Sequence, residues 1–122
     1  MDASDVLTGL LLAGDEDFTG GEIRARMKTH MRALPADAGA AELANALRES
    51  VAQRTAQLAA QTPEFFAGMI TRFDGQRVTR LEMLQFVKEH ELTHRAQLFM
   101  YLRLKGIVPA TTRRRLAKQA AK

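Results

Sequence analysis

Apolar positions recur at three- and four-residue steps along most of the chain, which is the spacing of one face of an α-helix. The stretch from Thr79 to Pro109 shows this pattern best. Both of its ends carry helix signals, since Thr79 and Glu82 form a capping box and Gly106 supplies a left-handed stop. The pattern therefore predicts one long helix near the C-terminus. One stripe of this helix holds Met83, Val87, His90, His94, Gln97 and Tyr101.

Two helices are predicted in the first third of the chain. Ser4 or Asp5 is placed to cap the first, which carries the apolar run that follows. Thr19 and Glu22 form a second capping box, which starts a helix from Gly20 to Leu34. The buried face of this second helix is expected to hold Ile23, Met27, Met31 and Leu34.

The middle of the chain adds a third helix and a small excursion. An alanine-rich segment from Ala40 to Gln61 has high helix propensity. Its stripe consists of Leu43, Leu47, Val51, Arg54 and Leu58. Thr62 and Pro63 form the N-cap and first position of a short turn, and Asp74 with Gly75 marks a tight turn between short extended segments. Together these elements predict an all-α, antiparallel bundle of about four helices, with a hairpin-like excursion before the last helix.

Length and composition limit the class of protein. At 122 residues the chain is expected to form one domain, which we place at residues 1–110, followed by a basic tail at residues 111–122. The absence of cysteine excludes disulfides and suits a cytoplasmic location. No apolar run is long enough to span a membrane, and the run from Leu7 to Ala13 lacks the basic flank of a signal peptide.

The net charge of +4 is a property of the C-terminal end. No acidic residue follows His94. The cations that accumulate there are Arg103, Lys105, Arg113, Arg114, Arg115, Lys118 and Lys122. Because no aromatic platform is interleaved with them and no nucleic-acid-binding motif is present, the sequence argues against a nucleic-acid partner. We expect a solvated, partly frayed terminus instead.

Two of the three histidines of the chain, His90 and His94, lie one turn apart on the long predicted helix. Imidazoles at positions i and i+4 can converge on one divalent cation when a third ligand arrives from elsewhere. His30 is the candidate third ligand, with Glu16, Asp17, a partner chain or water as alternatives. The competing interpretation is that these rings are bound by backbone or carboxylate groups and hold no metal.

The same residues also form an H-E-x-x-H string, His90-Glu91-Leu92-Thr93-His94, in which Glu91 would be the general base of a zincin metalloprotease. No histidine, aspartate or glutamate follows His94, whereas zincins take their third ligand from downstream of the motif. The chain also offers almost no strand for presenting a peptide. The sequence therefore disfavours a protease.

The long helix resembles the last helix of the DinB/YfiT-like family, in which a histidine is followed four residues later by His-Arg-Gly-Gln-Leu and then by Tyr-Leu-Arg-x-x-Gly. The matching residues are His90, His94, Arg95, Gln97, Leu98, Tyr101, Leu102, Arg103 and Gly106. Ala96 replaces the usual glycine. The resemblance covers about residues 5–109, is specific at the last helix, and is loose before it.

The resemblance implies a four-helix bundle, often dimeric, that holds a divalent metal such as Zn, Ni or Mn through three histidines. Members include metal-dependent transferases that use the low-molecular-weight thiols bacillithiol or mycothiol, and maleylpyruvate isomerase. His90 and His94 match two of the ligands. The third does not carry over: one register, in which the chain lacks the family's first helix, places Gly9 there, and another places Arg26 there, one turn before His30.

Three functional hypotheses follow. The first is a metal-dependent thiol transferase acting on a small-molecule substrate, with an incomplete histidine triad. The second is a catalytically degenerate bundle with a structural role. The third is a nucleic-acid binder that uses its basic tail. A homodimer is expected in the first two cases, because a bundle that lacks one helix exposes an apolar groove which a second copy can cover.

Overall fold

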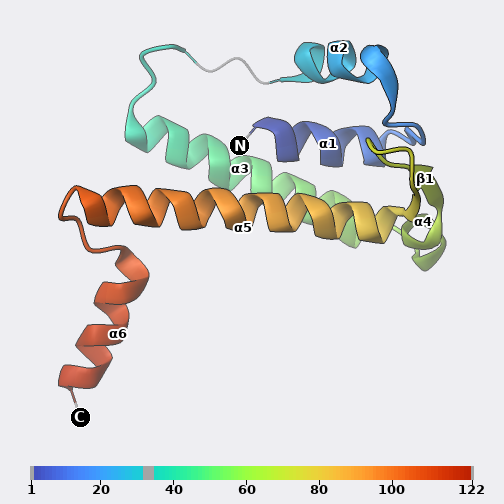
Figure 1. The fold of residues 1–122 in the computed structure, drawn as a ribbon. Helices are drawn as coiled ribbons and strands as arrows, with labels where there is room; N and C mark the ends of the chain where they lie inside the picture. Colours follow the sequence, from blue (N-terminus) through green and yellow to red (C-terminus); the bar gives the residue numbers. More distant parts are fainter. Residues whose placement is uncertain (1, 32–34, 122) are drawn as a thin grey trace. The chain divides into compact units, whose positions relative to one another are not determined.

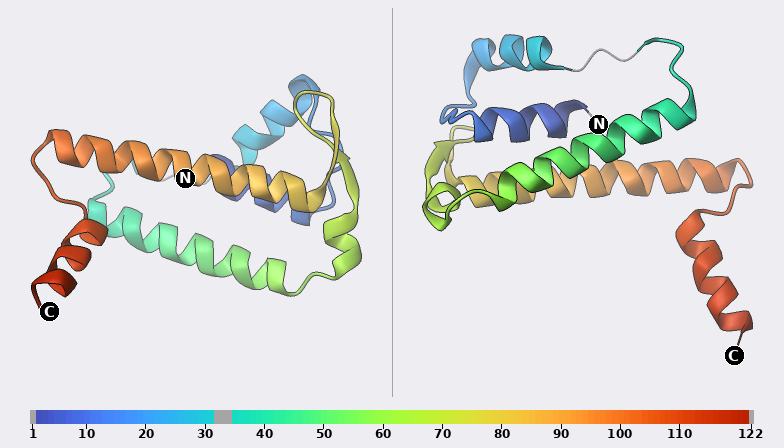
Figure 2. Two further views of the ribbon diagram at one scale, coloured as in Figure 1. Left: turned by 60° about the horizontal axis from the view of Figure 1, so that its bottom comes forward. Right: turned by 180° about the vertical axis from the view of Figure 1, so that it is seen from behind.

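The computed structural model describes residues 2–31 and 35–121. The chain divides into two compact units, residues 1–88 and residues 89–122. Figures 1 and 2 show the elements in order. These are α1 (Asp2–Leu12), α2 (Gly20–His30), α3 (Ala40–Ala59), α4 (Pro63–Ala67), β1 (Met69–Thr71), β2 (Arg77–Thr79), α5 (Arg80–Leu104) and α6 (Ala110–Ala120). Apart from the β1–β2 pair, the regular structure of the described residues is helical, which confirms the predicted all-α class.

The core of the first unit is built around α1, which contacts both α2 and α3 (Figure 1). Leu11 of α1, Ile70 of β1 and Met83 of α5 are fully buried in it. The hydrophobic cluster consists of Val6, Leu7, Leu10, Leu11, Phe18, Ile23, Ile70, Val78, Met83 and Val87. Because these residues come from two helices, the loop after α1, the hairpin and the start of α5, the cluster fixes all of these elements together.

The predicted cap of the first helix was wrong. The helix α1 begins at Asp2, so Ser4 and Asp5 lie inside it. The Ser4 carbonyl accepts a hydrogen bond from the Thr8 hydroxyl at 2.8 Å. The Asp5 carboxylate accepts hydrogen bonds from Ser50 Oγ at 2.6 Å and from Arg54 Nε at 2.8 Å, both on α3. Asp5 therefore joins two helices instead of starting one.

Helix α2 has the predicted start but not the predicted cap or end. Thr19 occupies the N-cap position but makes no side-chain cap hydrogen bond, and its backbone N–H and its hydroxyl both donate to Asp17 Oδ1, at 2.8 and 2.6 Å. The helix ends at His30, and Met31 is 48% exposed, not buried as predicted. Leu34, the last residue of the predicted helix, lies outside the described residues.

Helix α3 confirms the long alanine-rich helix, but its apolar stripe is not covered. Leu43, Leu47 and Val51 are 41%, 43% and 55% exposed. The buried residue of this helix is Ala46, and Arg54 pairs with Asp5. The small side chain of Ala46 allows a close approach to another element, which a leucine stripe would not. The long apolar residues of α3 therefore remain available to solvent.

The short excursion after α3 follows the predicted turn chemistry. Thr62 caps α4 by accepting from the Phe65 backbone N–H at 3.4 Å, and Pro63 holds the first helical position. Strands β1 and β2 pair antiparallel with Ile70 opposite Val78. Gly75 has a φ of 81° in the connecting turn, which explains why glycine is needed there. The second strand of the hairpin thus ends directly before the first residue of α5.

Helix α5 begins at the predicted capping box. The Thr79 backbone N–H donates to Glu82 Oε2 at 2.7 Å, and the Glu82 backbone N–H donates to Thr79 Oγ1 at 3.1 Å. The backbone and hydroxyl donors of Thr79 lower the pKa of Glu82 below its ordinary value. At its other end Gly106 has a φ of 73°, and the Ile107 N–H returns to the Leu102 carbonyl at 2.8 Å. Both predicted ends are confirmed.

The C-terminal segment is a helix, not the frayed terminus expected from its charge. Helix α6 spans Ala110–Ala120, and Lys122 lies outside the described residues. Pro109 precedes it and is fully buried, and Arg103 Nη2 donates to Thr112 Oγ1 at 3.3 Å. These contacts lie within the second unit and tie α6 to the end of α5. Arginine, lysine, glutamine and alanine are good helix formers, so the segment after Pro109 forms a helix.

We predict that Leu11→Ala lowers the free energy of unfolding by about 2–5 kcal/mol, because it removes a fully buried side chain and leaves a cavity in the core of the first unit. Urea unfolding followed by far-UV circular dichroism measures this change. Leu12→Ala is the matched control, since Leu12 lies next along α1 but is only half buried. Equal losses from both substitutions would show that α1 does not organise the core.

Candidate functional site

The two histidines of α5 are brought together. His90 Nε2 and His94 Nε2 lie 3.0 Å apart. The ring centroids are 4.4 Å apart, and the ring planes are almost perpendicular, at 86°. Both residues belong to the second unit and both are exposed. The predicted convergence of their nitrogen atoms is therefore present within one helix.

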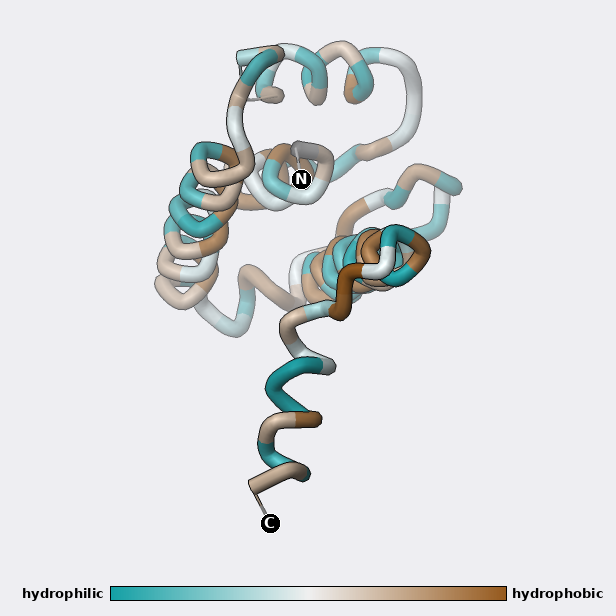
Figure 3. Tube along the Cα trace, turned by 90° about the vertical axis from the view of Figure 1, so that its left-hand side faces the viewer, coloured by the Kyte–Doolittle hydropathy of each residue, from teal (hydrophilic) through white to brown (hydrophobic). Residues whose placement is uncertain are grey.

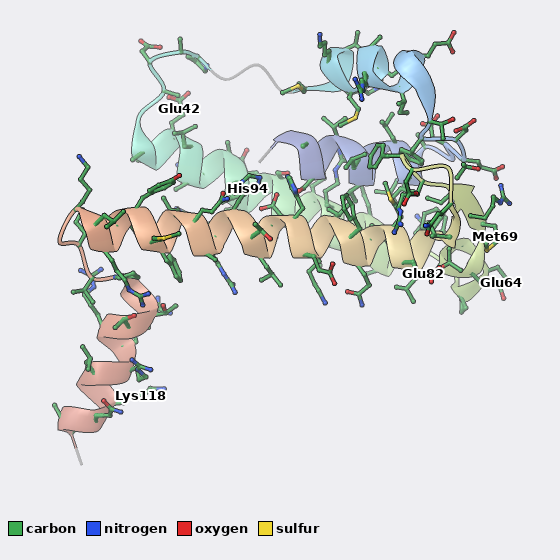
Figure 4. The ribbon with its side chains drawn as sticks, in the orientation of Figure 1. Glu42, Glu64, Met69, Glu82, His94 and Lys118 are labelled. Carbon is green, nitrogen blue, oxygen red and sulfur yellow. The ribbon has the colours of Figure 1, made fainter. Side chains whose placement is uncertain are left out.

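This convergence follows from local helix geometry. Residues four apart lie one above the other on a helix surface, with their Cβ atoms about 5–6 Å apart. Each imidazole can therefore extend its Nε2 toward the same point beside the helix. Figure 4 labels His94 on α5. Because both side chains share one continuous helix, their separation depends on no packing between the units.

Gln97 supports the orientation of His94. The Gln97 side-chain oxygen Oε1 lies 3.2 Å from His94 Nδ1. With the amide oxygen as acceptor, Nδ1 carries the proton and Nε2 keeps its lone pair. Histidines that bind metals usually donate their second ring N–H in this way, which fixes the tautomer and the ring orientation. The sequence places Gln97 on the same stripe as His94, and its three-residue step from His94 is the signal for this role.

The distance between the two Nε2 atoms fits a shared metal ion. With metal–nitrogen bonds of about 2.0–2.1 Å, a separation of 3.0 Å gives a nitrogen–metal–nitrogen angle of roughly 90–95°. That angle suits neighbouring positions of an octahedral site. A tetrahedral site needs a separation of about 3.3 Å, which small side-chain rotations provide. The chemistry of the donors agrees, because imidazole suits Zn, Ni and other divalent transition metals.

His30, the predicted third ligand, belongs to the first unit. It is the last residue of α2 and is exposed, and its Nδ1 lies 2.8 Å from the Arg26 carbonyl oxygen. This contact favours a proton on Nδ1 and leaves Nε2 as the available nitrogen. Its role as a metal ligand stays a prediction.

The two carboxylates considered as third ligands already have partners in the first unit. Arg80 Nη2 lies 3.3 Å from Glu16 Oε1. Asp17 accepts from the hydroxyl and the backbone N–H of Thr19, and these two hydrogen bonds lower the pKa of Asp17 below its ordinary value. Within residues 2–31 and 35–121, no group of three histidine, cysteine, aspartate or glutamate side chains is arranged to hold a metal ion.

The two positions where the resemblance would place a third histidine serve other purposes. A Cβ atom added to Gly9 would lie 2.8 Å from Arg54 Nη2, so the absence of a side chain makes room for the guanidinium that pairs with Asp5. Arg26 forms an ion pair with Asp15, which raises the pKa of the Arg26 guanidinium above its ordinary value. Each position therefore contributes to an ion pair.

Comparison with known proteins assigns the chain to a family. A family model described as the DinB family matches residues 20–121. The chain belongs to the DinB family. The match to the DinB model covers every element from α2 to α6 and leaves α1 outside it. No curated protein and no solved structure gives a significant match. In the described part of this DinB protein, no helix combines the length and the apolar character needed to cross a membrane.

Proposed function

We propose that this DinB-family chain binds a divalent metal ion, such as Zn, Ni or Mn, through His90 and His94 and acts as a metal-dependent transferase on a low-molecular-weight thiol. The single observation that carries the proposal is the 3.0 Å separation of the two Nε2 atoms on α5. The 3.2 Å contact between His94 Nδ1 and Gln97 Oε1 supports it, because a proton on Nδ1 that is donated to this oxygen leaves Nε2 with a lone pair for the ion. We further propose a cytoplasmic location, which the lack of cysteine supports.

The residues of the chain have separate roles in this proposal. His90 and His94 hold the ion, and Gln97 orients His94. The sulfur nucleophile comes from a small molecule, since the chain has no cysteine. The metal ion supplies Lewis-acid stabilisation of a thiolate at neutral pH. We propose that a third ligand from outside α5 completes the site and that water and the thiol fill the positions left open, which exposure of both rings permits.

We predict that protein purified without a polyhistidine tag contains a divalent metal ion in near-stoichiometric amount. His90→Ala with His94→Ala should remove that metal, because both nitrogen ligands are lost. Mass spectrometry of the metal content measures this. The same preparations are assayed for conjugation of a small thiol to an electrophilic acceptor, and the double variant should lose this activity with its metal.

His30→Ala is the control for the metal measurement, because it removes a histidine that lies outside the pair. Retention of metal in this variant is expected of a two-histidine site. Loss of metal would identify His30 as the third ligand. Metal content that is unchanged in the His90 and His94 double variant would contradict the proposal. Metal binding without thiol conjugation would contradict the transferase activity but not the metal site.

Gln97→Leu should weaken metal binding by about 10–100-fold, because His94 loses the acceptor that orients its ring. Gln97→Glu is the conservative comparison, since a carboxylate also accepts from Nδ1–H and should restore the affinity. Titration with Zn or Ni in competition with a coloured chelator measures both. An affinity of the leucine variant equal to that of the original chain would show that the ring needs no such partner.

We also propose that the protein is a homodimer that covers the apolar stripe of α3. Leu43, Leu47 and Val51 support this, since they are at least 41% exposed and recur at four-residue steps. Leu43→Glu with Leu47→Glu should convert the dimer to a monomer, because charges at a dimer interface are costly to desolvate. Size-exclusion chromatography with light scattering measures the mass. A monomer in the unsubstituted protein would overturn this part of the proposal.

The second candidate function is that of a structural bundle without catalysis. It is favoured by one observation, that no third ligand accompanies the histidine pair among the described residues. Two imidazoles alone hold a metal weakly, so such a protein would keep its fold and lose its ion during purification. The metal measurement above separates the two candidates.

A further inference from the structure

We propose that α6 is a binding site for the phosphate backbone of double-stranded nucleic acid, recognised without regard to sequence. The proposal is independent of the metal site. It reverses the expectation drawn from the sequence, where the basic residues were assigned to a frayed terminus. The structure instead places three of them, Arg114, Arg115 and Lys118, on one face of a folded helix.

The geometry of α6 concentrates its positive charge on one side. An open hollow of about 470 Å³ is lined by Thr111, Arg114, Arg115, Lys118 and Gln119. At 100° per residue these five positions fall within an arc of about 140°. The side chains offer two guanidinium groups, one ammonium group, one hydroxyl and one carboxamide, all of which can donate hydrogen bonds to phosphate oxygens. Figure 4 labels Lys118 on this helix.

The remaining positions of α6 have a different character. Leu116 lies about 130° from the centre of the basic arc, and Ala120 and Arg113 lie almost opposite to it. Thr112, at the edge of the arc, receives the hydrogen bond from Arg103 that ties α6 to α5. In Figure 3 the part of α6 that carries the three consecutive arginines is strongly hydrophilic. The helix thus carries three of its four cations on one face and contacts α5 through Thr112, at the edge of that face.

Within the described part of the second unit, residues 89–121, no carboxylate forms an ion pair with the cations of α6. Arg114 and Lys118 are four residues apart, a spacing at which like charges destabilise a helix. A polyanion would relieve this repulsion and release its own condensed counterions on binding. The charge of this face is therefore complementary to a phosphate backbone.

Nucleic acid fits this face better than an anionic membrane does. A helix that binds a membrane surface needs a broad apolar face, and Leu116 is the one large apolar residue of α6. Arginine supplies two of the three cations in the hollow, and its planar fork matches phosphate oxygens. The helix has no aromatic residue to stack on bases, which argues for backbone contacts on duplex and not for single-strand binding.

We predict that the full chain binds a fluorescein-labelled DNA duplex of mixed sequence, measured by fluorescence anisotropy. Three phosphate contacts give a slope of log K against log salt of about −2.7, so binding should weaken by roughly 40-fold between about 50 and 200 mM salt. A second duplex of unrelated sequence should bind equally well. Vesicles that contain an anionic phospholipid should bind no more tightly than neutral vesicles.

Replacing Arg114, Arg115 and Lys118 with glutamine should weaken duplex binding by roughly tenfold or more at low salt and flatten the salt dependence. Glutamine preserves helix propensity, so far-UV circular dichroism should be unchanged. The matched control replaces Arg24, Arg48 and Arg113 with glutamine, which removes the same charge but includes the α6 arginine opposite the basic face. The affinity of this control variant for the duplex should be within about threefold of the affinity of the original chain.

Three results would overturn the proposal. The first is no duplex binding at about 50 mM salt. The second is equal loss of binding in the two triple variants, which would show a response to net charge and not to this face. The third is binding to anionic vesicles without binding to duplex, which would make α6 a membrane-surface helix.

Discussion

The periodicity of α5 is the constraint on which the candidate site depends. Its start is fixed by the Thr79–Glu82 capping box and its end by Gly106, so the helix runs without interruption through both histidines. An uninterrupted helix places positions 90 and 94 on one stripe, and their nitrogen atoms meet at 3.0 Å. The two nitrogen atoms of the candidate site are therefore preorganised by secondary structure alone. Helix geometry does not fix the position of a third ligand, because such a ligand must come from another element or from solvent.

In the first unit, apolar burial and an ion pair hold α1 against its neighbours. The cluster around Leu11 supplies apolar burial, and the Asp5–Arg54 ion pair adds a polar link between α1 and α3. Gly9 is part of this link, because a side chain at that position would meet the Arg54 guanidinium. A histidine there would displace Arg54 from Asp5. The chain thus uses, for helix packing, a position at which the family resemblance would place a metal ligand in one register.

The sequence predicted those elements whose signals are local. The Thr62–Pro63 start of α4 and the Asp74–Gly75 turn both formed as expected, since each depends on residues close together in the chain. The capping box proposed at Thr19 failed for an equally local reason. Asp17, two residues earlier, accepts from the Thr19 backbone N–H, the donor that Glu22 would take in a capping box, and also from the Thr19 hydroxyl. A motif of two residues therefore predicts a cap only where no nearer partner competes.

The sequence by itself determined the helices, the spacing of His90 and His94, and the membership of the DinB family that the match over residues 20–121 shows. Tertiary structure alone decided burial. It left Leu43 and Leu47 of α3 exposed and buried Ala46. The physical reason is the separation in sequence of the residues that interact. Helix periodicity involves residues three or four apart, whereas burial and ligand convergence depend on residues that are distant in the chain.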